Sequence, residues 1–288
     1  MGAVDHVRWR NETFDDTTLD RPVLVAAFEG WNDAGDAASG AVRYLIDRYE
    51  AELIADIDPE DFFDFTSTRP QAEMDDDGVR RIVWPSTEIY AGSLPGDAGD
   101  VVLVIGTEPQ LRWRTFSSQI TGLAEQLGCR LVVILGALVA EVPHSRPVPV
   151  MGTVNDPALE ADLGLQPSTY QGPTGVVGVL AAACFEAGLA AASLWAAVPT
   201  YVPTAPSPKA VLALLERTAG VLGVWVPTTD LEIAAAAYER QVTELVEEDE
   251  ETSDYVSQLE ERHDADDGGT AGRSLVEEVE RYLRERRD

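Results

Sequence analysis

The sequence has few of the residues from which metal, disulfide and phosphate sites are built. It contains two cysteines and three histidines, all far apart, and Lys209 is its single lysine. A zinc site needs closely spaced cysteines or histidines, and a disulfide scaffold needs a dense, even cysteine pattern. No phosphate loop, dinucleotide fingerprint or nucleophile elbow follows the predicted strands. We therefore expect no metal and no cofactor, and the commonest catalytic motifs are excluded.

Basic residues are also scarce. The chain has 21 lysines and arginines against 51 acidic residues, a formal net charge of -30. Nucleic-acid binding proteins need basic residues, and anionic membranes repel this charge, so we expect neither partner. A positively charged partner is compatible with this charge, but solubility explains the charge equally well. The excess of arginine over lysine is typical of a GC-rich genome, with a salt-adapted source as the alternative.

Long apolar runs are missing as well. No segment is both long enough and free enough of Gly, Pro and charge to span a bilayer. Residues 1–20 are polar and acidic, so this N-terminal segment resembles neither a signal peptide nor an anchor. Cys129 and Cys184 lie in apolar surroundings, where cysteine is typically a small buried hydrophobe. We expect a cytoplasmic location.

What the sequence does contain is a series of buried strands, led by Val23–Phe28. This continuous apolar run is typical of a strand that is covered on both faces. Gly30 permits a sharp exit, and Asn32 or Asp33 can accept hydrogen bonds from a helix that begins near Ala34. In open α/β sheets, ligands bind at such strand-to-helix turns.

The remaining pattern alternates strands with helices, which indicates an α/β core with a mixed, largely parallel sheet. The region from Gln71 to Gly78 is predicted as a turn, and a hairpin should close around it. Further strands are predicted at 53–57, 62–66, 79–84, 101–106, 131–138, 148–154 and 193–198, and helices at 37–49, 116–127, 176–187 and 210–222.

Composition changes after Pro227, so we divide the chain into an N-terminal segment (1–20), an α/β core (21–227) and an acidic helical extension (228–288). Residues in alternating four- and three-residue steps predict a coiled-coil-like seam that the core or another subunit must cover. The acidic run 247–251 is a solvated face or a bend. A linker is expected at 263–272, followed by a final helix. The predicted seam consists of Leu231, Ala235, Tyr238, Val242, Leu245, Val256 and Leu259.

Polar residues follow three of the predicted strands. If those strands are parallel neighbours, the three clusters converge at one edge of the sheet, where carboxylates beside a histidine and an arginine could perform acid–base chemistry. Alternatively, Glu29 or Glu108 pairs with Arg112 or Arg146 and only pins loops together. The turn 172–175 could offer backbone N–H groups to an anion. The candidate pocket comprises Glu29, Asn32, Asp33, Glu108, Arg112, His144, Arg146 and Thr174.

Four stretches, in this order and spacing, resemble the proteasome assembly chaperone 2 family in the longer form found in actinobacteria. They are Phe28-Glu-Gly-Trp-Asn-Asp-Ala-Gly35, Gly106-Thr-Glu-Pro-Gln-Leu-Arg-Trp-Arg-Thr-Phe116, Pro143-His-Ser-Arg-Pro147 and Gly172-Pro-Thr-Gly175. The resemblance implies a three-layer α/β core like that of nucleoside phosphorylases and a homotrimer. It also implies core proteasome α-subunits as possible partners.

Relatives dock through a C-terminal tail of a hydrophobic residue, a tyrosine and any residue, whereas this sequence ends Glu285-Arg-Arg-Asp288. Two functions are consistent with the sequence. One is a non-enzymatic oligomeric assembly or interaction protein; the other is a small-molecule-binding hydrolase or transferase that uses the candidate pocket.

Overall fold

The structure is a computed structural model of the chain and describes residues 4–10, 19–75, 78–156, 159–160, 163–168 and 170–266. Its centre is an eight-stranded sheet in the order β1-β3-β6-β7-β2-β8-β10-β9. The strands are β1 (Val7–Trp9), β2 (Val23–Glu29), β3 (Glu52–Ile57), β6 (Thr87–Ser93), β7 (Asp100–Thr107), β8 (Leu131–Ala140), β9 (Val150–Val154) and β10 (Ala191–Pro199).

The middle of the sheet is parallel and its two sides are antiparallel. Strand β2 pairs in parallel with β7 and β8, and β8 pairs in parallel with β10. Strands β1, β3 and β6 extend the sheet beside β7 with antiparallel pairs, and β9 pairs antiparallel with β10. The predicted mixed sheet is confirmed, with its parallel pairs at the centre.

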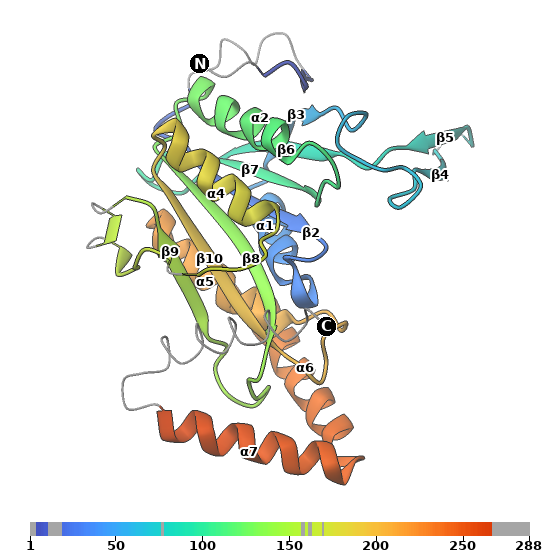
Figure 1. The fold of residues 1–288 in the computed structure, drawn as a ribbon, viewed down its shortest axis with the longest axis vertical. Helices are drawn as coiled ribbons and strands as arrows, with labels where there is room; N and C mark the ends of the chain where they lie inside the picture. The colour runs from blue at the N-terminus through green and yellow to red at the C-terminus, as the bar shows by residue number, and fades with distance from the viewer. Residues whose placement is uncertain are drawn as a thin grey trace.

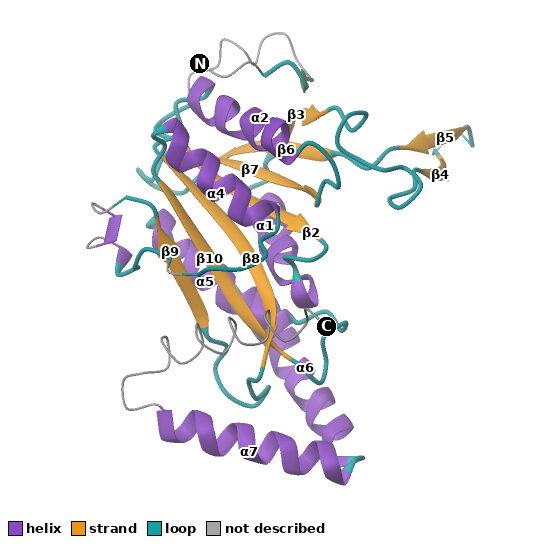
Figure 2. Cartoon of the chain, in the orientation of Figure 1, coloured by secondary structure: helices purple, strands orange, loops and turns teal. Residues whose placement is uncertain are grey.

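Helices cover both faces of the sheet and give three layers (Figures 1 and 2). Helices α1 (Ala37–Arg48) and α5 (Pro208–Leu222) pack on one face, and α2 (Trp113–Gln126) and α4 (Val176–Ala187) on the other. Alternate residues of β2 supply the two cores, because successive side chains of a strand point to opposite faces. Val25 belongs to the first core and Phe28 to the second.

Two helices extend the core at its lower end in Figure 1, namely α6 (Thr229–Glu247) and α7 (Glu250–Asp266). The break between them falls within the acidic run 247–251, so the predicted bend is confirmed. The predicted seam is buried at Ala235, Tyr238, Val242, Val256 and Leu259. At the end of α6 the prediction is wrong: Leu245 is 59% exposed, and Val246 is buried in its place.

The aromatic stretch 62–66 was predicted as a strand, and this prediction is wrong. Phe62 and Phe63 are both buried instead of alternating, and Phe62 packs edge-to-face on Phe116. The carboxylate of Asp64 then accepts hydrogen bonds from the backbone N–H and the hydroxyl of Thr66, which turns the chain. The region 71–78 was predicted as a turn, and this too is wrong in its first half, because Gln71–Met74 forms strand β4. The hairpin is therefore formed further on, by β4 and β5 (Arg80–Val83).

Other predicted elements are present with small shifts in their ends, and strands β1, β4 and β6 were not predicted. The linker was predicted at 263–272, and this is wrong for residues 263–266, which continue helix α7; residues 267–272 and the predicted final helix lie outside the described residues. Among the residues that the structure describes, no helix combines the length and the apolar character needed to cross a membrane.

Candidate functional site

The turn after β2 is held by Asp33. Its Oδ1 accepts hydrogen bonds from the backbone N–H of Ala38 at 2.7 Å and of Ser39 at 3.2 Å, in the first turn of α1. The predicted capping role therefore belongs to Asp33, although a 3-10 turn (Ala34–Asp36) precedes the α-helix. Burial raises the pKa of the Asp33 carboxyl, since burial disfavours its charged form.

Glu108 connects this turn to helix α4. Its Oε1 accepts a hydrogen bond from Nδ2 of Asn32 at 2.6 Å and another from the backbone N–H of Val176 at 2.8 Å. The carboxylate thus caps α4, whose own N-cap residue, Gly175, has no side chain to do so. Only glycine fits at 175, because a Cβ there would lie 2.4 Å from the side chain of Asn32.

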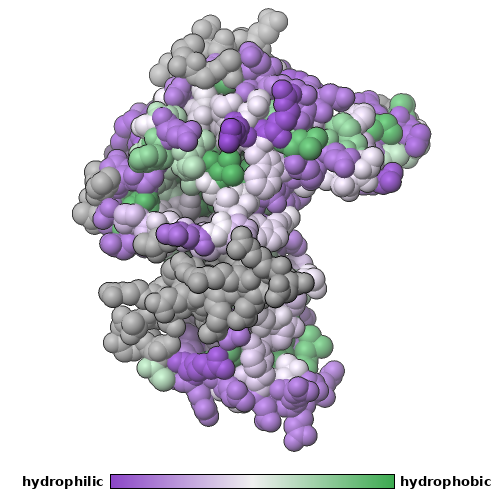
Figure 3. Space-filling model, in the orientation of Figure 1, coloured by the Kyte–Doolittle hydropathy of each residue, from purple (hydrophilic) through white to green (hydrophobic). Residues whose placement is uncertain are grey.

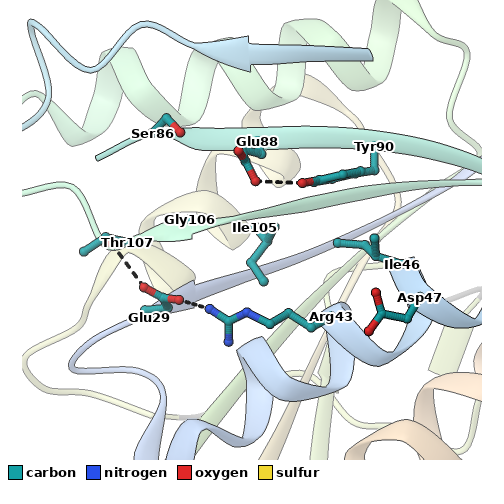
Figure 4. Close-up of a pocket in the computed structure, with 10 residues that line it drawn as sticks. All are labelled: Glu29, Arg43, Ile46, Asp47, Ser86, Glu88, Tyr90, Ile105, Gly106 and Thr107. Atoms are coloured by element: carbon teal, nitrogen blue, oxygen red, sulfur yellow. Dashed lines mark hydrogen bonds and ion pairs between the residues drawn. The ribbon is translucent and has the colours of Figure 1, made fainter. Parts of the chain in front are cut away.

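Glu29 lies at the same sheet edge, but it lines a cavity of about 400 Å³ whose walls do not include Asp33 or Glu108 (Figure 4). It forms an ion pair with Arg43 of α1 and accepts a hydrogen bond from the Thr107 hydroxyl at 3.3 Å. On the opposite wall, the Tyr90 hydroxyl donates to Glu88 at 2.8 Å. The complete lining is Glu29, Arg43, Ile46, Asp47, Ser86, Glu88, Tyr90, Ile105, Gly106 and Thr107.

The contacts of Arg112 and Thr174 indicate local structural roles for both residues. Arg112 is the N-cap residue of α2, has a left-handed backbone (φ 53°) and forms an ion pair with Asp61 at 2.5 Å. The Thr174 hydroxyl makes a long contact, 3.5 Å, with the carbonyl oxygen of Gly175. In these contacts, neither side chain joins Glu29 or Glu108.

The third predicted cluster holds the helical extension instead of joining the other two. One ring nitrogen of His144 is 2.8 Å from the Tyr201 hydroxyl, and the other is 3.0 Å from the Thr243 hydroxyl of α6. Arg146 makes two hydrogen bonds with the carboxylate of Asp264 in α7, at 2.7 and 2.8 Å. We name this set of contacts the clasp; it also includes Ser145 with Glu260, Arg262 with Glu141 and Lys209 with Glu239.

The clasp lies beyond the other clusters because β8 continues past the level at which β2 ends. Residue Asp33, after the end of β2, bridges to Ala137, while β8 runs on to Ala140 and the chain reaches His144 still later. Burial, followed by repulsion from Lys209, lowers the pKa of the His144 imidazole. His144 is therefore a neutral hydrogen-bonding group in the clasp at neutral pH.

The arrangement offers little for nucleophilic chemistry. Burial raises the pKa of the Cys129 and Cys184 thiols to about 12, so neither is a reactive thiolate. Among the described residues, no three histidine, cysteine or carboxylate side chains are grouped to hold a metal ion. The sequence analysis missed Arg43, Glu88 and Tyr90 in the cavity. The spacing of Glu88 and Tyr90 places both on one face of β6, but that strand itself had not been predicted.

Fold and site together define a three-layer α/β protein whose polar residues mostly fix turns, helix ends and the helical extension. The chain belongs to the PAC2 family, whose model matches residues 27–246. This match crosses the predicted boundary at 227 and includes nearly all of α6. No protein with a curated description matches the sequence significantly.

Solved structures are similar over most of the chain. A PAC2 family protein from Streptomyces avermitilis is 47% identical, with a TM-score of 0.77, and the match covers 82% of this chain and 99% of that one. A proteasome-assembly chaperone homologue from Mycobacterium tuberculosis is 48% identical, with a TM-score of 0.74 and coverage of 81% and 99%. A second Mycobacterium tuberculosis protein, of unknown function, is 29% identical, with a TM-score of 0.83 and coverage of 100% and 98%.

Proposed function

We propose that this protein is a non-enzymatic, oligomeric assembly protein that acts as a chaperone for core proteasome α-subunits. The observation that carries the proposal is the 48% identity, over 81% of the chain, to a protein described as a proteasome-assembly chaperone homologue. The contacts of the candidate site agree with this role. Glu108 caps a helix, Asp33 caps another, and His144 and Arg146 hold the extension.

We further propose that the protein is a cytoplasmic homotrimer of actinobacterial type. An assembly protein that is symmetric presents several equivalent surfaces to a ring-forming partner, which suits the organisation of subunits into rings. The net charge of -30 favours a partner surface that carries basic residues. The helical extension is proposed as a separate unit from residue 228 onward.

The proposal is tested by mixing the purified chain with separately purified core proteasome α-subunits and following the mixture by sedimentation velocity. We expect a new species that sediments faster and contains both proteins. The amount of this complex should fall as added salt screens the charges. A matched protein of the same net charge controls for non-specific attraction. If the two proteins sediment independently at low and at physiological salt, the chaperone role is wrong.

A further inference from the structure

The β4–β5 hairpin, here named the arm, extends away from the body of the molecule (Figure 1). All eight residues of its two strands are exposed. An isolated two-stranded hairpin is marginally stable in water, since it has no core beneath it. The arm is attached to the body at its base, where Trp84 packs edge-to-face on Phe65 with a ring-centroid distance of 4.8 Å.

The arm has one apolar face and one polar face. Residues that are directly opposite in an antiparallel pair share a face, and the register pairs Ala72 with Ile82 and Met74 with Arg80. This first face is apolar apart from Arg80, and Met74 is 66% and Ile82 48% exposed.

The other face pairs Gln71 with Val83 and Glu73 with Arg81. It is polar apart from Val83, and its cation is neutralised locally, because Arg81 forms an ion pair with Asp75. Figure 3 shows hydrophobic residues in green along the arm, at the right of the view. The pattern is that of a strand pair with one buried face, yet the described part of this chain does not cover that face.

Arg80 distinguishes the apolar face of the arm from a surface that associates non-specifically. No hydrogen bond or ion pair joins its side chain to another residue that the structure describes, although the chain carries 51 acidic residues. A cation within an apolar patch fits a partner surface that is hollow, partly apolar and negative.

The cavity in Figure 4 has these properties. Its walls carry three carboxylates (Glu29, Asp47 and Glu88) against one guanidinium, Arg43, so its formal excess is two negative charges. Ile46 and Ile105 supply apolar surface. Asp47 is exposed, and its carboxylate makes no hydrogen bond or ion pair with another described residue.

We propose that the arm of one copy of this chain docks on a second copy, with Arg80 entering the cavity among Glu29, Asp47 and Glu88. The arm and the cavity are different surfaces, so the contact is head-to-tail, and such contacts close into rings when the rotation between copies allows it. The inference rests on the oligomeric state of the proposed function and names the surfaces that produce it.

The apolar face is tested by two matched variants, Ile82→Glu and Val83→Glu. Both residues lie on β5 with similar exposure, 48% and 46%, but on opposite faces of the arm. Oligomer dissociation is measured by sedimentation velocity over a dilution series, and melting curves check that each variant folds. Ile82→Glu should weaken association by more than about tenfold, while Val83→Glu changes it little. Equal effects of the two variants, or none, would overturn the docking of the apolar face.

The cavity is tested by exchanging charges. Arg80→Asp alone and Asp47→Arg alone should each weaken association. The double variant should recover most of the loss, because the two charges have then exchanged places and attract each other again. If the single variants weaken the oligomer but the double variant does not recover it, the cavity is not the receiving surface. If the unaltered chain is monomeric at every concentration, the oligomeric part of the proposed function fails too. If it is oligomeric and insensitive to all these changes, only the present inference fails.

Discussion

Glu108, a residue type that often serves in catalysis, makes contacts here that join structural elements. A single carboxylate oxygen binds the side-chain amide of Asn32 and the first free N–H of α4, within 2.6 and 2.8 Å. These contacts join the loop after β2, the loop after β7 and the start of a core helix. At the residue scale, the candidate site is thus a junction between elements.

The junction predicts the cost of removing Glu108. Glu108→Ala leaves the Asn32 amide and the Val176 N–H without their acceptor, so we expect the free energy of unfolding to fall by about 1–3 kcal/mol. Glu108→Gln should cost less, because its amide oxygen can still accept both bonds. Urea denaturation measures both variants, and an alanine variant as stable as the unaltered chain would contradict the capping role.

His144 predicts a dependence of stability on pH. Its pKa is lowered in the folded chain, first by burial and then by Lys209, while Glu239 and Glu260 act in the opposite direction. The unfolded chain therefore takes up this proton first, and the stabilisation is lost as the pH falls below the ordinary value of 6.5.

We expect the free energy of unfolding of the unaltered chain to fall more steeply from about pH 7.5 to about pH 5.5 than that of His144→Gln. Chemical denaturation at several pH values gives the two slopes. Because both proteins share every carboxylate, the difference between the slopes isolates the histidine. Parallel slopes would show that protonation of His144 is not linked to unfolding.

At the scale of elements, the register of helix α6 is the informative case. The heptad pattern predicted Leu245 in the seam, whereas Val246 is buried and Leu245 is 59% exposed. A straight α-helix has 3.6 residues per turn, so its buried face drifts away from a strict seven-residue repeat. The buried residues Tyr238, Val242 and Val246 follow four-residue steps and cluster with Tyr201, Val202 and Val256 of α7 in the same chain.

This register predicts that substitutions at two neighbouring residues change the free energy of unfolding by very different amounts. Val246→Ala should lower the free energy of unfolding by about 1–3 kcal/mol, because it removes buried methyl groups and leaves a cavity. Leu245→Ala should change it by less than about 0.5 kcal/mol. Both variants place alanine in the same turn of α6, and since valine is the weaker helix former, propensity alone would favour Val246→Ala. A larger loss of stability at Leu245 would restore the heptad register.

The elements that were predicted well from the sequence are those with a strong local pattern of residues. The apolar runs of β2, β7 and β8 and the small-residue helix α4 lie close to their predicted positions. Strand β6 was missed because Thr87-Glu-Ile-Tyr-Ala-Gly-Ser93 mixes polar and apolar residues without a clean alternation. Stretch 62–66 failed because both phenylalanines are buried by tertiary packing, which overrides the local pattern.

The site was predicted only in part, because some of its residues contact partners that are far away in the sequence. Asn32 and Glu108 were expected to meet because they follow adjacent strands, and they do. His144 was grouped with them on the same argument, but the extra length of β8 and the later helices determine its surroundings. Residues that contact it, such as Thr243, lie about a hundred positions away, which no local pattern encodes.

At the scale of the whole molecule, charge and topology act together. A net charge of -30 makes copies of the chain repel one another, so any stable oligomer needs local attraction that exceeds this repulsion. The arm, with Arg80 on an apolar face, and the acidic cavity provide surfaces of that kind. The same charge leaves most of the surface available to a basic partner.

The most direct test of this account is native mass spectrometry on the protein isolated at low salt from its own host. The account predicts an oligomer of this chain that carries core proteasome α-subunits and no stoichiometric small molecule. An oligomer that lacks α-subunits but retains a small molecule in stoichiometric amount would contradict it and direct attention to the cavity beside Glu29 and Glu88.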